Sequence, residues 1–306
     1  MRLIDRFAAA PRAIHVRDPA GIVHRLPGTG YRNDTLAACP QRYILDERAS
    51  KACHSLAMQG DFLLQLCPDA VRLPAPVFWI EWIANPPVSE EPNTRVGALV
   101  ESDETGREGF VTPFFDGPDG QIRMVPGRLK FDLDNRLTPE PASADSFGIM
   151  HASLGSAGRL LHHAIFQQQH AWAEFHRASA PAAVIQHQLE MAETSWLLLP
   201  MTLAFAALLN SGGALSERAS DFARLNAKRA RCGKSELLEH IEVRMSLELC
   251  LYQSSDHKAT GLRSQPRRHP VRGHLVRRGG RIFWRKAHVR GDIGRTMLSR
   301  TVRVAG

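Results

Sequence analysis

The sequence predicts an α+β fold, and three stretches of the chain carry that prediction. Residues 77–83 are short, aromatic and β-branched, as a largely buried strand requires. Residues 196–209 form an apolar run of about 14 residues, too short to cross a membrane and suited to a buried core helix. Residues 271–278 and 281–288 flank a Gly-Gly pair, the pattern of a two-residue hairpin turn.

These stretches lead us to expect three parts. The first is an N-terminal antiparallel β-rich domain over residues 1–141. The second is a helical hairpin with a third helix, over residues 142–233. The third is a small basic C-terminal antiparallel sheet, over residues 234–306.

The N-terminal part opens with a stretch that looks irregular up to about residue 45. Within it, residues 14–24 are expected to form a small hairpin whose turn is supplied by Asp18, Pro19 and Gly21. A helix is expected over residues 46–66. The strand at residues 77–83 then begins a meander. The further strands are expected at residues 95–101, 109–115, 121–125 and 128–133.

The central part has a helical period. A first helix is expected between Leu154 and Phe175, and a second runs from Pro181 into the apolar run. A third is expected from Leu215 to Cys232, and Gly233 just beyond it suits a left-handed helix cap. In the C-terminal part, residues 243–249 alternate with a period of two before the hairpin begins.

Charge is distributed unevenly along the chain. Residues 261–306 hold twelve arginines and one lysine against one aspartate, a net charge of +12. The whole chain carries +8, so the first 260 residues sum to −4. Such a basic segment indicates a polyanionic partner, and the preference for arginine favours bidentate phosphate contacts. Nucleic acid is the first candidate, and an acidic host protein is the second.

The hairpin can be divided into two faces. A two-residue turn pairs Arg278 with Arg281, and cross-strand partners share a face. One face is apolar, and we expect Trp284 on it to be buried while Arg285 on the other face is exposed. The apolar face holds Val271, Leu275, Ile282 and Trp284. The basic face has an aromatic residue in its middle, as a phosphate-tracking surface with a stacking platform would have. The candidate nucleic-acid-binding residues are Arg268, Arg272, His274, Arg278, Arg281, Phe283 and Arg285.

Catalysis and metal binding find weaker support. His274, with neighbouring arginines, is a weak candidate for the general base of a small nuclease, although no spacing here is diagnostic. Three histidines crowd the hairpin, but His274 and His288 fall on opposite faces, so no metal site is predicted. Asp132 and Asp134 alternate on one strand without the third acid of a magnesium site. No cofactor is expected.

The cellular compartment is inferred from the cysteines and the N-terminus. Five cysteines form no Cys-x-x-Cys pair, which favours a reducing cytoplasm over a disulfide framework. Residues 1–21 lack the apolar core of a signal peptide. We therefore expect a cytoplasmic protein without a membrane partner.

Two segments resemble a group of bacteriophage and prophage proteins. The first reads Leu-Asn-Ala-Lys-Arg-Ala-Arg-Cys-Gly-Lys from residue 225, and the second reads Arg-Arg-His-Pro-Val-Arg-Gly-His-Leu-Val-Arg-Arg from residue 267. Trp284 and Arg290-Gly291-Asp292 follow, and the resemblance covers roughly residues 196–304. The group has no assigned activity, so the resemblance transfers no catalytic residue. It implies a phage-encoded protein working in the bacterial host.

The leading interpretation is a non-enzymatic phage accessory protein that binds nucleic acid, or a nucleoprotein complex, through the C-terminal hairpin. One alternative is an interaction protein that inhibits a host defence or polymerase component. The other is the small nuclease that would use His274.

Overall fold

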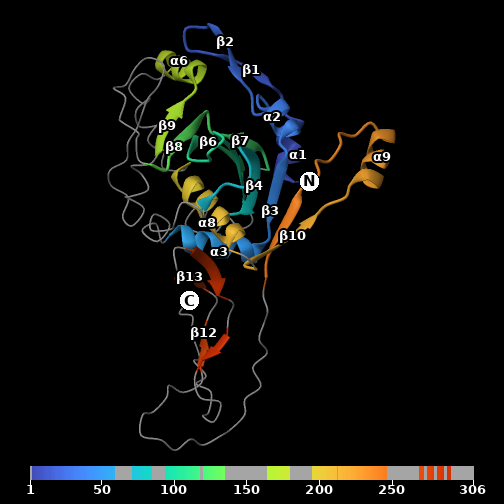
Figure 1. Ribbon diagram of the computed structural model, residues 1–306. Coiled ribbons are helices and arrows are strands. Elements are labelled where there is room, and N and C mark those ends of the chain that lie inside the picture. Colours follow the sequence, from blue (N-terminus) through green and yellow to red (C-terminus); the bar gives the residue numbers. More distant parts are fainter. Residues whose placement is uncertain are drawn as a thin grey trace, which may run out of the picture.

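The structure is a computed structural model (Figure 1). It describes residues 2–58, 71–84, 94–117, 120–134, 164–179, 195–211, 213–246, 269–271, 274–278, 281–285 and 288–290.

The described chain mixes helices and strands, which confirms the α+β class. The helices are α1 (Leu3–Ala8), α2 (Asn33–Ala38), α3 (Glu47–Ala57), α6 (His170–Ser179), α8 (Leu198–Asn210) and α9 (Ala223–Arg231). The strands up to the middle of the chain are β1 (Ala13–Arg17), β2 (Val23–Pro27), β3 (Gln41–Leu45), β4 (Val77–Ile83), β5 (Arg95–Ser102), β6 (Glu108–Asp116), β7 (Ile122–Met124) and β8 (Gly127–Asp132). The later strands are β9 (Ala164–Gln168), β10 (Leu215–Ala219), β11 (Ile241–Met245), β12 (His269–Val271), β13 (His274–Arg278), β14 (Arg281–Arg285) and β15 (His288–Arg290).

One large sheet organises the protein. Its strand order is β10-β11-β3-β4-β5-β6-β8-β9, with β7 paired to β6 off this path. The expected strands from β4 to β8 are present and pair antiparallel, but β8 pairs with β6 and not with its chain neighbour β7, and β9 adds a further antiparallel strand that we did not expect. The sheet is nevertheless mixed, because β3 lies parallel to both β4 and β11. Parallel neighbours need a crossover connection, and α3 lies in the chain that connects β3 to β4.

The expected all-helical centre is wrong in two places. β9 lies inside the first expected helix and pairs with β8, where Ala164, Ile165 and Phe166 are all buried. β10 replaces the start of the third expected helix and pairs with β11. In both places pairing with a distant strand decides the local conformation, which the helical period of the sequence does not show. The large sheet thus takes strands from all three expected parts of the chain.

The first 45 residues hold more regular structure than we expected. The hairpin of β1 and β2 is confirmed, but α1, α2 and β3 were missed. Each of the two helices has six residues, too few to show a clear period or to be stable alone. They depend on packing against the sheet.

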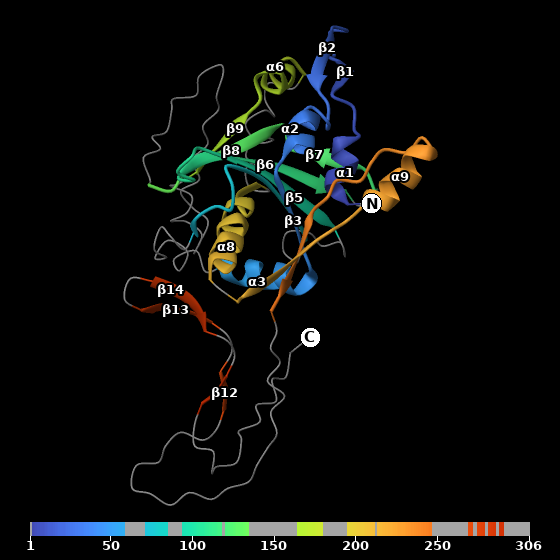
Figure 2. The same cartoon turned by 45° about the vertical axis from the view of Figure 1, so that its right-hand side comes forward.

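Helices cover both faces of the sheet. Figure 2 shows α3 and α8 on one side, and α1 and α2 on the other. Side chains of β4 alternate between the two cores, since Phe78 and Ile80 pack with α3 and α8 whereas Trp79 packs with α1 and α2. Every residue of α8 from Leu198 to Leu208 is buried, which confirms the predicted core helix.

Candidate nucleic-acid interface

The C-terminal hairpin has the register that the sequence predicts. β13 pairs antiparallel with β14, so that Arg278 lies opposite Arg281 and His274 lies opposite Arg285. β12 pairs with β15, with Val271 opposite His288, again as expected. Cross-strand partners occupy one face of a ladder.

The structure describes this candidate site in part. The positions of Arg278, Arg281, Phe283, His274 and Arg285 are brought together in one two-stranded ladder. Arg285 is exposed, as predicted. The remaining two candidates, Arg268 and Arg272, lie outside the described residues, and so does the prediction that the Trp284 side chain is buried.

A second cationic surface lies on the chain between β10 and β11. We call residues 220–240 the α9 arm, because α9 stands away from the sheet at its outer end in both ribbon views (Figures 1 and 2). No residue of α9 is buried, and its sequence contains no acid. The basic residues of the arm are Arg224, Lys228, Arg229, Arg231 and Lys234.

Three of these cations form an exposed stripe. Arg224, Lys228 and Arg231 are spaced by four and three residues, so they lie on the same side of the helix. All three are exposed, and no residue in the described part of the chain forms an ion pair or hydrogen bond with their side chains. Arg229 is different, because it is half-buried and its Nε donates to the Ser235 carbonyl oxygen at 2.7 Å. The stripe is therefore free to meet a ligand, while Arg229 holds the arm together.

Hydrogen bonds between the Asn226 side chain and the Leu237 backbone fix the shape of the arm. Asn226 Nδ2 donates to the Leu237 carbonyl oxygen at 2.9 Å, and the Leu237 amide donates to Asn226 Oδ1 at 2.8 Å. Gly233 ends the helical turn with a φ of 63°, in the left-handed region that the sequence predicts for it. These contacts close the loop that returns from α9 to β11.

The returning limb is fastened to α1. The Leu238 amide donates to Asp5 Oδ1 at 2.8 Å, and Arg2 forms an ion pair with Glu242 at 3.3 Å. A hydrogen bond from Arg244 is the main cause that lowers the pKa of Glu242, and Arg2 acts in the same direction. Glu242 therefore stays ionised as a partner for Arg2.

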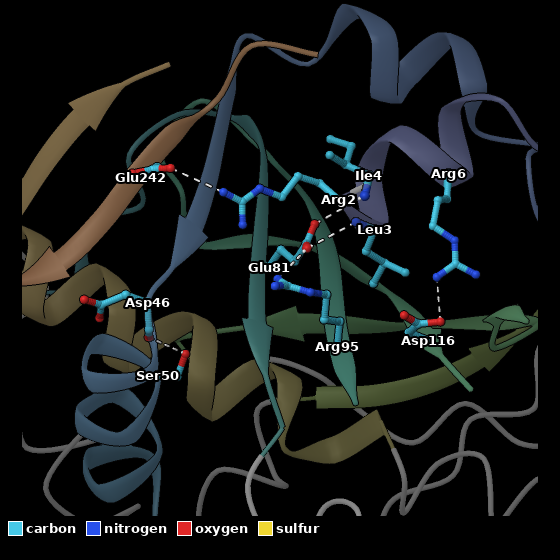
Figure 3. A network of polar contacts seen from close by, with 10 residues as sticks. All are labelled: Arg2, Leu3, Ile4, Arg6, Asp46, Ser50, Glu81, Arg95, Asp116 and Glu242. Carbon is cyan, nitrogen blue, oxygen red and sulfur yellow. Dashed lines mark hydrogen bonds and ion pairs between the residues drawn. The ribbon is translucent and has the colours of Figure 1, made fainter. Parts of the chain in front are cut away.

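The first helix is fixed in turn by a carboxylate on the sheet. Glu81 on β4 is fully buried, and its two oxygens accept from the amides of Leu3 at 3.2 Å and Ile4 at 3.3 Å (Figure 3). Arg95 donates to the same carboxylate at 3.1 Å. The unsatisfied amides of a helix start and a buried negative charge thus satisfy each other.

The residues considered for a metal site serve other contacts. Asp134 forms an ion pair with Arg107, whose Nε lies 3.1 Å away, and Asp132 accepts the Asp134 amide at 2.8 Å. Within the described ranges, no group of three histidines, cysteines or acids could hold a metal ion.

In the same ranges, no helix is long and apolar enough to cross a membrane.

Sequence reasoning missed the α9 arm as a candidate site. The cations in the last turn of α9 complement the helix dipole, and this structural role alone is enough to explain their presence in the sequence. A usable signal was present, because Ala223–Arg231 holds four cations and a single large apolar residue, Leu225, so this helix has little apolar surface to bury.

Comparisons with known proteins add no further assignment. No protein-family model, curated protein or solved structure matches the chain.

Proposed function

We propose that this protein binds nucleic acid through the C-terminal hairpin and the α9 arm, as a non-enzymatic, phage-encoded accessory protein of the bacterial cytoplasm. The observation that carries the proposal is the exposed stripe of Arg224, Lys228 and Arg231, together with the net charge of +12 over residues 261–306. The resemblance to phage proteins supports the setting but not the chemistry.

Physical chemistry favours phosphate as the ligand of both surfaces. Cations that face water without a partner gain most from a polyanion, since each phosphate contact releases condensed counterions. Arginine also matches the phosphate oxygens with two parallel donors. Two such surfaces on one chain raise the effective concentration of each for a long ligand.

Binding of labelled single-stranded and double-stranded DNA and RNA, measured by fluorescence anisotropy at several salt concentrations, tests the proposal. The hairpin variant replaces Arg272, Arg278, Arg281 and Arg285 with glutamine, and the arm variant replaces Arg224, Lys228 and Arg231 with glutamine. Each variant should bind more weakly for every sequence, and each lost phosphate contact should reduce the logarithmic salt slope by roughly one unit. The matched control replaces three cations elsewhere, Arg25, Arg48 and Lys51, and should bind like the parent.

Phe283→Ala provides a second signature. If Phe283 stacks on bases, its loss should cost about 1–3 kcal/mol for single strands and leave the salt slope nearly unchanged. Binding by both cation variants as tight as that of the parent at low salt would contradict the proposal.

Two parallel measurements separate the alternatives. An acidic host protein would remain bound in a pull-down from a nuclease-treated lysate, whereas a nucleic-acid ligand would be lost. A nuclease would cleave labelled RNA or DNA during incubation, and His274→Ala would abolish the cleavage. We expect neither result.

A further inference from the structure

The sheet carries a cationic cluster on β8 that the nucleic-acid surfaces do not use. Arg128 and Lys130 occupy alternate positions of β8, so they lie on the same face, and Leu129 between them belongs to the opposite core with α8. The guanidinium carbon of Arg128 lies 3.6 Å from the ring centroid of Phe110 on β6. Arg128 and Lys130 are both half-buried, and no described residue accepts a hydrogen bond from either side chain.

Glu101 is the carboxylate that lies across β6 from this cluster, and Arg32 already occupies it. Both oxygens of Glu101 accept from Arg32, with Nη1 to Oε1 at 3.0 Å and Nη2 to Oε2 as the second contact. Glu101 on β5 lies opposite Phe110 on β6, and Phe110 lies opposite Lys130 on β8. With Arg32 before α2, these side chains form a row across three neighbouring strands. The same face continues with Glu108 beside Phe110 and Asp132 beside Lys130, so the three cations Arg32, Arg128 and Lys130 share it with three acids.

The environment of Arg128 is unfavourable to its charge. Burial lowers the pKa of Arg128, and the positive charge of Arg32 lowers it further. A guanidinium in such a place normally has a fixed anionic partner, since a half-buried charge without one is costly.

An unpaired hydroxyl lies beside the same cluster. Thr112 alternates with Phe110 on β6 and therefore shares its face of the sheet. Its neighbour Val111 is paired with Leu129, which places Thr112 next to the position of Arg128. Thr112 is fully buried, and its Oγ1 has no hydrogen-bond partner. Buried polar groups are nearly always paired, so this hydroxyl also lacks an expected ligand.

We propose that Arg128, Lys130 and the Thr112 hydroxyl form a binding site for a phosphate group, in free phosphate or in a small phosphate monoester. Arg128 and Lys130 offer two positive charges to a ligand that carries about two negative charges near neutral pH. The guanidinium carbon of Arg128 lies over the ring of Phe110, and the planar guanidinium could donate two parallel hydrogen bonds to two phosphate oxygens. Arg32 stays with Glu101 and contributes through its charge. The half-buried side chains of Arg128, Lys130 and Phe110 give the site a side open to solvent.

Calorimetric titration of the full chain with inorganic phosphate and with adenosine 5′-monophosphate tests the site. Arg128→Gln should weaken binding of both by about tenfold or more, and Arg128→Lys should not restore it, because an ammonium lacks the planar pair of donors. The control Arg25→Gln removes an exposed cation from β2 and should leave both titrations unchanged.

Thr112→Val separates binding from folding. It removes a hydroxyl that has no partner, so the melting temperature without phosphate should stay the same or rise. Phosphate affinity should nevertheless fall severalfold. If Arg128→Gln fails to fold, Thr112→Val and Lys130→Gln carry the test.

The outcomes are distinct. Equal affinities for the two ligands would assign free phosphate, and tighter binding of the monophosphate would assign a nucleotide; either supports the site. Absence of saturable binding up to about 10 mM, or binding that Arg128→Gln leaves unchanged, would overturn it. The hairpin and arm variants leave these residues intact, so the site and the proposed nucleic-acid binding fail or succeed separately.

Discussion

Asp5 Oδ1 accepts a hydrogen bond from the Leu238 amide at 2.8 Å, across 233 residues of sequence. This bond joins the first helix of the chain to the limb that carries the α9 arm back into the sheet. Asp5 is itself buried, so the bond is partly shielded from water. The orientation of a candidate nucleic-acid surface therefore depends on how firmly α1 is attached.

Glu81→Gln should loosen that attachment. The amide keeps one acceptor oxygen, and its NH2 group would meet the donors of Leu3, Ile4 or Arg95. We expect a loss of about 3 kcal/mol in the free energy of unfolding. Denaturant unfolding measures the loss, and hydrogen exchange should show faster exchange at the Leu238 amide.

The control for this variant is Glu47→Gln. Glu47 pairs with Lys51 on the exposed side of α3, so its neutralisation should change stability little. Equal stabilities of the two variants would show that the Glu81 contacts do not hold α1.

Gly97→Ala should disturb the core beneath α1. An added Cβ would lie 2.3 Å from Cζ2 and 2.5 Å from Cη2 of Trp79, and Trp79 is fully buried. Relief of that clash requires a shift of the ring or of β5, which typically costs about 1–3 kcal/mol. Denaturant unfolding and the near-ultraviolet circular dichroism of the tryptophans should both change.

Gly233→Ala is a useful comparison because it introduces no clash. Its φ is +63° and nothing lies within 4 Å of an added Cβ, so only the left-handed backbone is penalised, by about 1–2 kcal/mol. An unaltered tryptophan spectrum is expected for this variant. A similar spectral change in both would argue against the close Gly97–Trp79 approach.

His54 should make the protein less stable as pH falls. Burial lowers the pKa of His54 below its usual 6.5, and its Nε2 has no hydrogen-bond partner. The unfolded chain therefore takes up the proton first, so the contribution of this group is fully present above pH 6.5 and is lost as pH falls through the folded value. The free energy of unfolding should decrease between pH 7.5 and 5.5 in the parent and decrease less in His54→Leu. Parallel pH profiles of the two proteins would contradict this assignment.

The described cysteines should differ sharply in reactivity. Cys232 in the α9 arm is exposed, whereas Cys39 and Cys53 are buried, and burial raises the pKa of Cys53 to about 12. In a Cys67→Ser, Cys250→Ser background, maleimide should label Cys232 roughly a hundredfold faster than the two buried thiols. Bound nucleic acid should protect Cys232 if the arm contacts it. Unchanged labelling at saturating ligand would restrict the interface to the hairpin.

Local pattern was enough for several elements of this chain. The Gly-Gly pair predicted a two-residue turn, and such a turn leaves a single register, with Arg278 opposite Arg281 as the structure has them. The strand at Val77–Ile83 and the apolar helix α8 could also be predicted from local sequence. Each is buried along its length, and its apolar composition indicates that burial.

Partners far apart in the sequence decided the rest. Residues 164–168 and 215–219 are strands because they pair with β8 and β11. The short helix α1 is stabilised by hydrogen bonds to the Glu81 carboxylate and by packing in a hydrophobic core. The phosphate site that we propose likewise joins side chains from β6, β8 and the segment before α2, none of which is marked by its neighbours in sequence. Composition and period determine which segments can be helix or strand and where the charge lies. Which strand pairs with which, and which cations are left without a partner, depends on long-range contacts that exist only once the chain has folded.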